Sequence, residues 1–257
     1  MKHISKLKKE DLKDIKMIVF DVDGVLVPRG TKISTDGDTL TLQIKKIQPH
    51  LIEKIKALHD KGLHINISSG RSLFMLQEMF RDILEYVSIT YENGSSTWFQ
   101  GNIIQHINSF DELNNLKDLL PALKIFDNFK GIEPKEFIVT IHCKDRIIEL
   151  EKDMACSNKN LYCLWNGEAY DIGIIDRQTK GFGLIELKEI LIRKEILCFN
   201  TETLAIGDNY NDIELLEQAN VKVTADKSRL KGDFYIDLEG KNLPGEVLID
   251  KILEVLE

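Results

Sequence analysis

The sequence lacks paired or clustered cysteine and histidine ligands. Its four cysteines form no C-x-x-C pair, and none of its six histidines stands at a metal-ligand spacing from another. Neither a zinc knuckle nor a disulfide framework is therefore predicted. We expect all four cysteines, Cys143, Cys156, Cys163 and Cys198, to be reduced core residues.

Long apolar segments are also missing. No uninterrupted apolar stretch reaches the roughly 18 residues that a transmembrane helix needs. The first ten residues carry the positive charge of a signal peptide without its apolar middle. These absences predict a soluble cytoplasmic protein with no membrane partner.

Basic residues are too few to favour binding to polyanions. The chain of 257 residues has 34 lysines and arginines against 42 acidic residues, a net charge of −8. This balance argues against sequence-independent binding of nucleic acid or of an anionic membrane surface. The G-x-G-x-x-G of dinucleotide-binding proteins is missing after the first predicted strand, which argues against a Rossmann dinucleotide site.

What the sequence does contain is a buried strand followed directly by two carboxylates. Residues 15–20 form a nearly continuous apolar run, which is typical of a strand buried on both faces of a parallel sheet. Asp21 and Asp23 follow, and side chains at i and i+2 of an extended chain point the same way. Because the two carboxylates repel each other, the pair favours a divalent cation or a raised pKa for one member. Gly24 permits a tight turn beside them.

Strands and helices alternate in the first and last parts of the chain, which predicts an α/β fold with a parallel sheet. The charged residues 1–14 are predicted to form a solvated helix or a loose arm. The pair Asp36-Gly37 lies between β-prone residues and indicates a flap-like hairpin over residues 32–45. The predicted strands cover residues 63–69, 87–91, 203–208, 221–224 and 234–237, and the predicted helices cover residues 50–61, 72–86, 184–192, 211–218 and a segment that begins near 246.

The middle of the chain follows a different rhythm, which indicates an inserted α+β unit. It contains a predicted hairpin over residues 97–107, helices over 110–120 and 145–156, and β-prone runs at 136–143, 161–165 and 169–175. We therefore predict two domains. A discontinuous catalytic core of residues 1–94 and 178–257 is interrupted by an α+β domain of residues 95–177.

Polar and aromatic side chains alternate along the β-prone runs of this inserted domain. They include His142, Trp165, Asn166, Glu168 and Tyr170. Alternating aromatic and apolar residues are more often core than ligand contacts, so the pattern does not predict any of these as site residues.

Three further stretches place polar residues at the ends of predicted elements. Asp208 ends an apolar strand as Asp21 does, and Asp212 follows it, but helix capping explains these two residues equally well when they are taken alone. Ser69 alone is best explained as an ordinary turn serine. Lys180 cannot be singled out among the many lysines, although a lysine at a helix start opposes the helix dipole and is favoured by a nearby anion.

Together these stretches form an ordered set of motifs: Asp21-Val-Asp-Gly-Val, Ser68-Ser-Gly-Arg71, Thr179-Lys-Gly181 and Gly207-Asp-Asn-Tyr-Asn-Asp212. The set resembles that of the haloacid dehalogenase (HAD)-like hydrolases, and most of all their Cof-like and sugar-phosphatase branch, which carries a cap between the second and third motifs. The resemblance implies a Rossmann-like parallel-sheet core with an inserted α+β cap. The hairpin over residues 32–45 is instead similar to the flap of capless phosphatases that act on 3-deoxy sugar acids.

The resemblance also implies catalytic roles. Asp21 would be the nucleophile that forms an aspartyl phosphate. Asp23 would protonate the leaving alcohol and then activate the water that cleaves the intermediate. Lys180 would neutralise the nucleophile and the phosphate, and Ser69 with the backbone from Gly70 onward would bind the phosphate.

By the same resemblance the cofactor would be Mg²⁺, bound by Asp21, the backbone carbonyl of Asp23, Asp208 and, through water, Asp212. The chain is then expected to be a magnesium-dependent phosphatase that hydrolyses a small phosphate monoester, a sugar or sugar-acid phosphate. A phosphomutase with the same intermediate, and a non-catalytic protein of this fold that binds a phosphate ligand, are the alternatives. The expected partner is a small phosphate ester, and homo-oligomer formation stays open.

Overall fold

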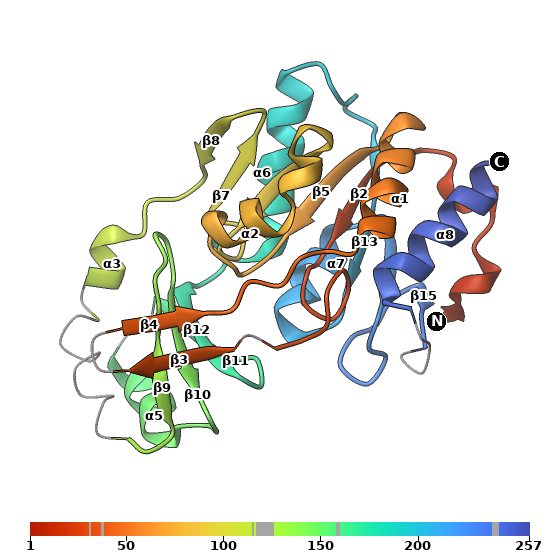
Figure 1. The fold of residues 1–257 in the computed structure, drawn as a ribbon. Coiled ribbons are helices and arrows are strands. Elements are labelled where there is room, and N and C mark those ends of the chain that lie inside the picture. The colour runs from red at the N-terminus through yellow and green to blue at the C-terminus, as the bar shows by residue number, and fades with distance from the viewer. Residues whose placement is uncertain (31, 37–38, 115, 117–125, 158–159, 238–241) are drawn as a thin grey trace.

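A computed structural model describes residues 1–30, 32–36, 39–114, 116, 126–157, 160–237 and 242–257 of the chain. Its largest element is a nine-stranded sheet (Figure 1). Counted in sheet order from β1, the first seven strands, which end with β6, are parallel to one another, and the last two, β7 and β8, are antiparallel to their neighbours. The predicted α/β fold is therefore confirmed. The strands in sheet order are β1 (Lys2–His3), β15 (Phe234–Tyr235), β14 (Val221–Thr224), β13 (Glu202–Gly207), β2 (Ile15–Phe20), β5 (His64–Ser68), β6 (Val87–Tyr91), β7 (Ser96–Phe99) and β8 (Asn102–Gln105).

Helices cover both faces of this sheet. Successive residues of β2 point to opposite faces, so that Ile18 and Phe20 join one buried cluster and Met17 and Val19 join another. The first cluster includes residues of α1, α2 and α8, and the second includes residues of α6 and α7. Burial on both faces explains the continuous apolar run of β2. These helices are α1 (Pro49–Asp60), α2 (Leu73–Met79), α6 (Lys180–Arg193), α7 (Ile213–Gln218) and α8 (Pro244–Leu256).

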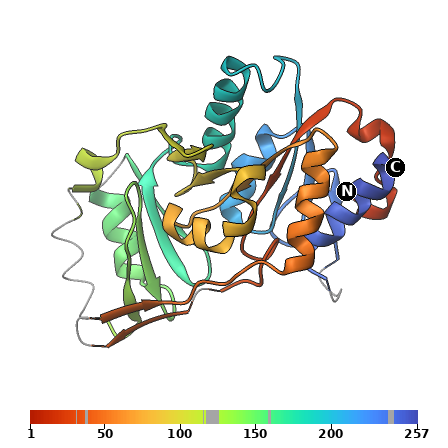
Figure 2. The same cartoon turned by 45° about the horizontal axis from the view of Figure 1, so that its top comes forward.

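A four-stranded antiparallel sheet with the order β11-β12-β10-β9 lies beside the large sheet (Figure 2). Helix α5 packs on it, because Leu150 and Met154 share a buried cluster with Ile141 and Ile172. The predicted flap forms as the hairpin β3–β4, and β3 lies next to β9. The elements are β3 (Ile33–Asp36), β4 (Thr39–Leu42), α3 (Phe110–Asn114), β9 (Phe129–Glu133), β10 (Val139–Cys143), α5 (Ile148–Ser157), β11 (Leu161–Trp165) and β12 (Ala169–Ile174).

The beginning of the chain differs from its prediction. Residues 1–14 form neither a solvated helix nor a loose arm, because β1 pairs with β15 at the edge of the large sheet. The apolar side chains Ile4, Leu7 and Leu12 are buried in the core. Two short 3-10 helices follow β1, η1 (Ile4–Lys6) and η2 (Lys9–Leu12). A third, η3 (Arg81–Tyr86), forms the end of the helix predicted over residues 72–86, and η5 (Tyr210–Asp212) precedes α7.

The predicted hairpin over residues 97–107 also has an unexpected position. It forms β7 and β8, but β7 pairs with β6, so the hairpin extends the large sheet rather than the small one. The smaller sheet begins only at β9. The division at residue 95 does not follow the strand pairing, and the domain limits stay a prediction.

Two smaller predictions have mixed outcomes. Of the helix expected over residues 110–120, α3 covers the first half, and most of the rest lies outside the described residues. All four cysteines are free, but Cys156 and Cys198 are exposed, so the expectation of core residues is wrong for these two. Among the described residues no helix is both long and apolar enough to cross a membrane.

The carboxyl ends of four parallel strands meet at one edge of the large sheet. Phe20 on β2 is in register with Ile206 on β13 and with Ile67 on β5, and Ser68 on β5 is in register with Thr90 on β6. The residues that follow these strands therefore emerge side by side. This edge is where ligands bind in open α/β sheets.

Candidate active site

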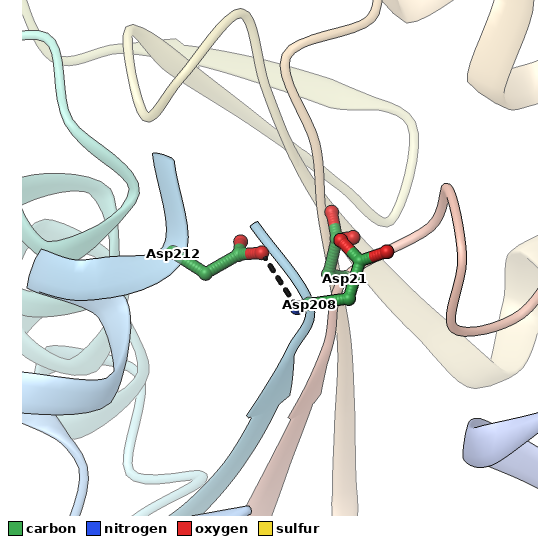
Figure 3. A group of neighbouring side chains, drawn as sticks. All are labelled: Asp21, Asp208 and Asp212. Atoms are coloured by element: carbon green, nitrogen blue, oxygen red, sulfur yellow. Dashed lines mark hydrogen bonds between the residues drawn. The ribbon is translucent and has the colours of Figure 1, made fainter. Parts of the chain in front are cut away.

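Three carboxylates from separate parts of the chain converge at this edge. Asp21 follows β2, Asp208 follows β13, and Asp212 ends η5 and points back toward the strand ends (Figure 3). One oxygen of each lies within 4.8 Å of the others, and all three residues are buried. The Asp212 carboxylate also accepts the backbone N–H groups of Asp208 and Asn209, at 3.0 and 3.1 Å. These bonds tie η5 to the end of β13 and fix the cluster.

Lys180 supplies a buried positive charge to this cluster. It is the first residue of α6, which begins there because Thr179 accepts the N–H of Phe182 at 3.1 Å as its N-cap. The Lys180 ammonium lies 2.5 Å from Asp21 Oδ1 and 2.6 Å from Asp212 Oδ1. Although burial lowers the pKa of Lys180, the two carboxylates outweigh it and raise that pKa. A lysine at a helix start is thus accommodated by adjacent anions.

The remaining charge imbalance disfavours ionisation of two carboxyls. Burial, followed by the charge of Asp212, raises the pKa of Asp21 well above its usual range, although Lys180 opposes the shift. The same two causes raise the pKa of Asp208 to about 6, against the hydrogen bond from Arg29. A cluster of oxygen ligands with excess negative charge is suited to a hard divalent cation such as Mg²⁺. The residues present therefore fit the metal that the motifs imply.

This imbalance predicts how stability depends on pH when no metal is bound. The pKa of Asp208 rises from 3.8 to about 6 on folding, so its stabilising effect is complete below pH 4 and is lost as the pH rises through 6. The loss is about 3 kcal/mol. Urea unfolding in EDTA between pH 4 and pH 7 should show this decline, and Asp208→Asn should flatten it. If the free energies of unfolding of the wild type and Asp208→Asn differ by the same amount at every pH, the prediction is contradicted. Added Mg²⁺ should restore the stability of the wild type at pH 7.

Glycine allows Asp208 to approach the first motif. Gly24 has a φ of +84°, and a Cβ atom at this position would lie 1.8 Å from Asp208 Oδ2. Any other residue would therefore be strained and would displace this carboxylate. The need for a tight turn, which the sequence indicates, is only part of the reason for this glycine.

Asp23, the second carboxylate of the first motif, forms a bidentate pair with Arg71. The Nε and Nη2 atoms of Arg71 each donate to one oxygen of Asp23 at 2.7 Å. Ser69 links Arg71 to β6: it donates its N–H to the carbonyl of Thr90, and its hydroxyl accepts the N–H of Arg71. The second motif thus brings a hydroxyl and a guanidinium to the same edge as Asp21.

These groups surround a cavity of about 250 Å³ between the large sheet and the small one. Asp21, Asp23, Ser69, Gly70 and Asp208 line it from the large-sheet side. Lys180, which pairs with both Asp21 and Asp212, and Asp212 itself lie deeper in the protein, at 1 and 0% side-chain exposure. The structure therefore brings together all the site residues that the sequence predicts.

The sequence did not predict several other residues of this cavity. Arg29, five residues after Gly24, pairs with the carboxylate of Asp208 and donates to its backbone carbonyl and to Asp226. The small sheet and the connections between its strands contribute charged and polar side chains: Glu133, Lys135, Thr140, His142, Asn166, Glu168 and Asp171. The only available signal was the alternation along β10 to β12, which does not indicate which face meets the cavity.

Comparison with known proteins places these motifs in a family. The model of the haloacid dehalogenase-like hydrolases matches residues 18–126 and 105–229. A phosphoglycolate phosphatase of Sulfolobus acidocaldarius is 24% identical over 247 residues, which are 94% of this chain and 97% of that one. A 5-amino-6-(5-phospho-D-ribitylamino)uracil phosphatase of Bacillus subtilis is 24% identical over 235 residues, 84% of this chain and 86% of that one.

The fold is similar to that of solved structures. The C-terminal domain of a trehalose-6-phosphate phosphatase from C. albicans superposes with a TM-score of 0.67 at 16% identity, over 96% of this chain and 94% of that one. At this identity the likeness concerns the fold alone. The family model, by contrast, spans most of the chain and includes the first, second, third and fourth motifs. The chain therefore belongs to the haloacid dehalogenase-like hydrolases.

Proposed function

We propose that this protein is a Mg²⁺-dependent phosphatase that hydrolyses a small phosphate monoester through an aspartyl phosphate on Asp21. The observation that carries the proposal is the position of Asp21. It lines the cavity, its Oδ1 is held by Lys180 at 2.5 Å, and two further carboxylates lie within 4.8 Å. Relatives of similar length are named as phosphatases, which supports the same reaction class.

The proposed reaction has two displacements at phosphorus. An oxygen of Asp21 attacks the phosphorus and forms an acyl-phosphate bond while the bond to the leaving alcohol breaks, and Asp23 gives that alcohol its proton. Asp23 then takes a proton from a water molecule, which attacks the same phosphorus. The bond between phosphorus and Asp21 breaks, inorganic phosphate leaves, and both carboxyls return to their initial states.

The other polar groups orient and neutralise the phosphate. Ser69 and Gly70 are proposed to bind it, because both line the cavity on the side where Arg71 begins the next segment. Lys180 balances the charge of Asp21 and Asp212 from within the core. Arg71 holds the carboxylate of Asp23 in one orientation through two hydrogen bonds of 2.7 Å.

A metal ion completes this arrangement of charges. Asp21, Asp208 and the backbone of Asp23 would hold it, and Asp212 would support its hydrated side. When bound, Mg²⁺ supplies Lewis-acid charge that lets an anionic carboxylate approach an anionic phosphate. Binding of Mg²⁺ also requires the carboxyls of Asp21 and Asp208 to lose their protons, although burial favours the protonated forms.

The proposal is tested by a screen for phosphate release. Sugar phosphates, sugar-acid phosphates and nucleotides are offered to the purified protein with Mg²⁺, and the Asp21→Asn protein serves as the blank. We expect turnover of some sugar-type esters that stops in EDTA and returns with added Mg²⁺. Undiminished turnover in EDTA, or product analysis that shows an isomerised phosphate ester in place of inorganic phosphate, would overturn the proposal.

A further inference from the structure

The small sheet presents a buried, charged wall to the cavity. Glu133 ends β9, Lys135 lies two residues beyond it, Thr140 and His142 lie on β10, and Asp171 lies on β12. The charged and titratable side chains among these are only 3 to 5% exposed. Burial of so many ionisable groups at one place needs partners for each of them. We call these five residues the cap wall.

One oxygen of the cap wall is left without a hydrogen-bond donor. Glu133 Oε2 accepts the ring Nε2 of His142 at 2.9 Å, but Oε1 has no hydrogen-bond partner among the described residues and is buried. Its nearest cation, the ammonium of Lys135, is 3.6 Å away. The positive charge of Lys135 and the hydrogen bond from His142 nevertheless outweigh burial and lower the pKa of Glu133 to about 2. Because Glu133 also lines the cavity, its carboxylate is an ionised acceptor beside whatever enters there.

The lysine of the cap wall is already matched by carboxylates. Lys135 donates to Thr140 at 2.6 Å and lies within 3.8 Å of both Glu133 and Asp171. The wall therefore has two carboxylates against one lysine, and protonation of His142 would only balance it.

The arginines of the cavity are matched in the same way. Arg71 pairs with Asp23. Arg29 pairs with Asp208 and Asp226, and Arg229 lies 3.5 Å from Asp226. A second anionic group on the substrate, beyond its phosphate, would find no uncompensated cation among these residues and would face the ionised Glu133.

We propose that Glu133 is a specificity-determining residue, which accepts a hydroxyl of the leaving group and rejects leaving groups that carry a carboxylate. The inference rests on the proposed phosphatase function and narrows its substrate class. The preferred substrates are phosphate esters of uncharged, hydroxyl-rich skeletons such as sugars and sugar alcohols. Sugar-acid and hydroxy-acid phosphates are discriminated against, because they bring a carboxylate to a carboxylate.

Matched ester pairs test this selectivity. Sorbitol 6-phosphate and 6-phosphogluconate differ only in whether the end remote from the phosphate is a hydroxymethyl or a carboxylate, and glycerol 3-phosphate and 3-phosphoglycerate form a shorter pair. We expect the wild-type kcat/KM to be at least about tenfold higher for the hydroxyl member of a pair that is turned over. In Glu133→Gln this ratio should fall at least about tenfold, chiefly because the acid is hydrolysed faster. Glu133→Asp, which keeps the charge, should still disfavour the acid.

The control is Glu149→Gln, which makes the same change of charge at an exposed position of α5 on the same sheet. Its ratio should equal that of the wild type. Equal kcat/KM values for both members of a pair in the wild type would overturn the proposal. So would a Glu133→Gln protein that melts normally and keeps the wild-type ratio. If Glu133→Gln fails to fold, the wild-type kcat/KM values for the two members of a pair still test the proposal.

Binding separates this proposal from the phosphatase function. Isothermal titration of the Asp21→Asn protein with the same esters measures preference without turnover. Preferential binding of sorbitol 6-phosphate over 6-phosphogluconate, together with no hydrolysis of any ester by the wild type, would reject the catalytic function and support the selectivity. Hydrolysis that requires Asp21 but favours the acid would support the function and reject the selectivity.

Discussion

Replacement of Asp21 by asparagine is expected to lower kcat by at least about a thousandfold and to leave the protein folded. An amide of nearly the same shape cannot attack phosphorus, so the aspartyl phosphate does not form. The fold should survive because burial and Asp212 raise the pKa of Asp21 well above normal, which means that the cluster is relieved when this charge is removed. Phosphate release and thermal unfolding measure the two effects, and the midpoint should equal or exceed that of the wild type.

Trapping of the intermediate distinguishes a lost nucleophile from a displaced substrate. Acid quenching after brief exposure to a radiolabelled ester should leave label on the wild-type protein and none on Asp21→Asn. Asp14→Asn is the matched control, since Asp14 is exposed one residue before β2 and should keep full activity. An Asp21→Asn protein within tenfold of wild-type activity would rule out the covalent mechanism.

The convergence of the motifs could be predicted from sequence because it depends on topology. A strand buried on both faces must lie inside a parallel sheet, and the ends of neighbouring parallel strands share one edge. Asp21 and Asp208 therefore meet wherever β2 and β13 are adjacent, as their register shows. The position of Lys180 needs one more condition, the start of α6 at Thr179, and its residue type alone does not reveal it.

The cap wall could not be predicted in the same way. On an antiparallel sheet, alternate residues face opposite sides, and only tertiary packing decides which side meets a ligand. His142 and Asn166 line the cavity. Tyr170, which belongs to the same set of polar and aromatic residues in the sequence, is instead buried in the core of the small sheet beside Trp165. Arg29 follows the first motif without any periodic or family signal, and it meets Asp208 only in the folded chain.

Glu92 connects the edge of the large sheet with the cap wall. It follows β6, has a φ of +48° and is fully buried. Its carboxylate accepts three successive backbone N–H groups, those of Glu136, Phe137 and Ile138, at distances down to 2.6 Å. The Glu92 N–H in turn donates to the carbonyl of Arg71. This residue therefore fixes the segment between Lys135 and Thr140 relative to the second motif.

Loss of this carboxylate should weaken both the fold and the recognition of the leaving group. We expect Glu92→Ala to lower the free energy of unfolding by about 3 kcal/mol, because three N–H groups lose a charged acceptor. Burial raises the pKa of Glu92 and so reduces the net gain from its charge, which is why the loss should be smaller than the sum of three bonds. Glu92→Gln, which keeps one acceptor oxygen, should have an intermediate effect. Urea unfolding measures these differences.

A positioning role predicts a particular kinetic pattern as well. The Glu92 side chain does not line the cavity among the described residues, whereas Lys135 and Thr140 on either side of its partner segment do. In Glu92→Ala, kcat/KM should therefore fall more for an ester that reaches the cap wall, such as sorbitol 6-phosphate, than for acetyl phosphate, which is too short to reach it. Glu136→Ala is the matched control, because its side chain is exposed and its backbone N–H is retained. Equal losses for the long and the short substrate would show that Glu92 supports stability alone, and unchanged unfolding would show that its three hydrogen bonds contribute nothing.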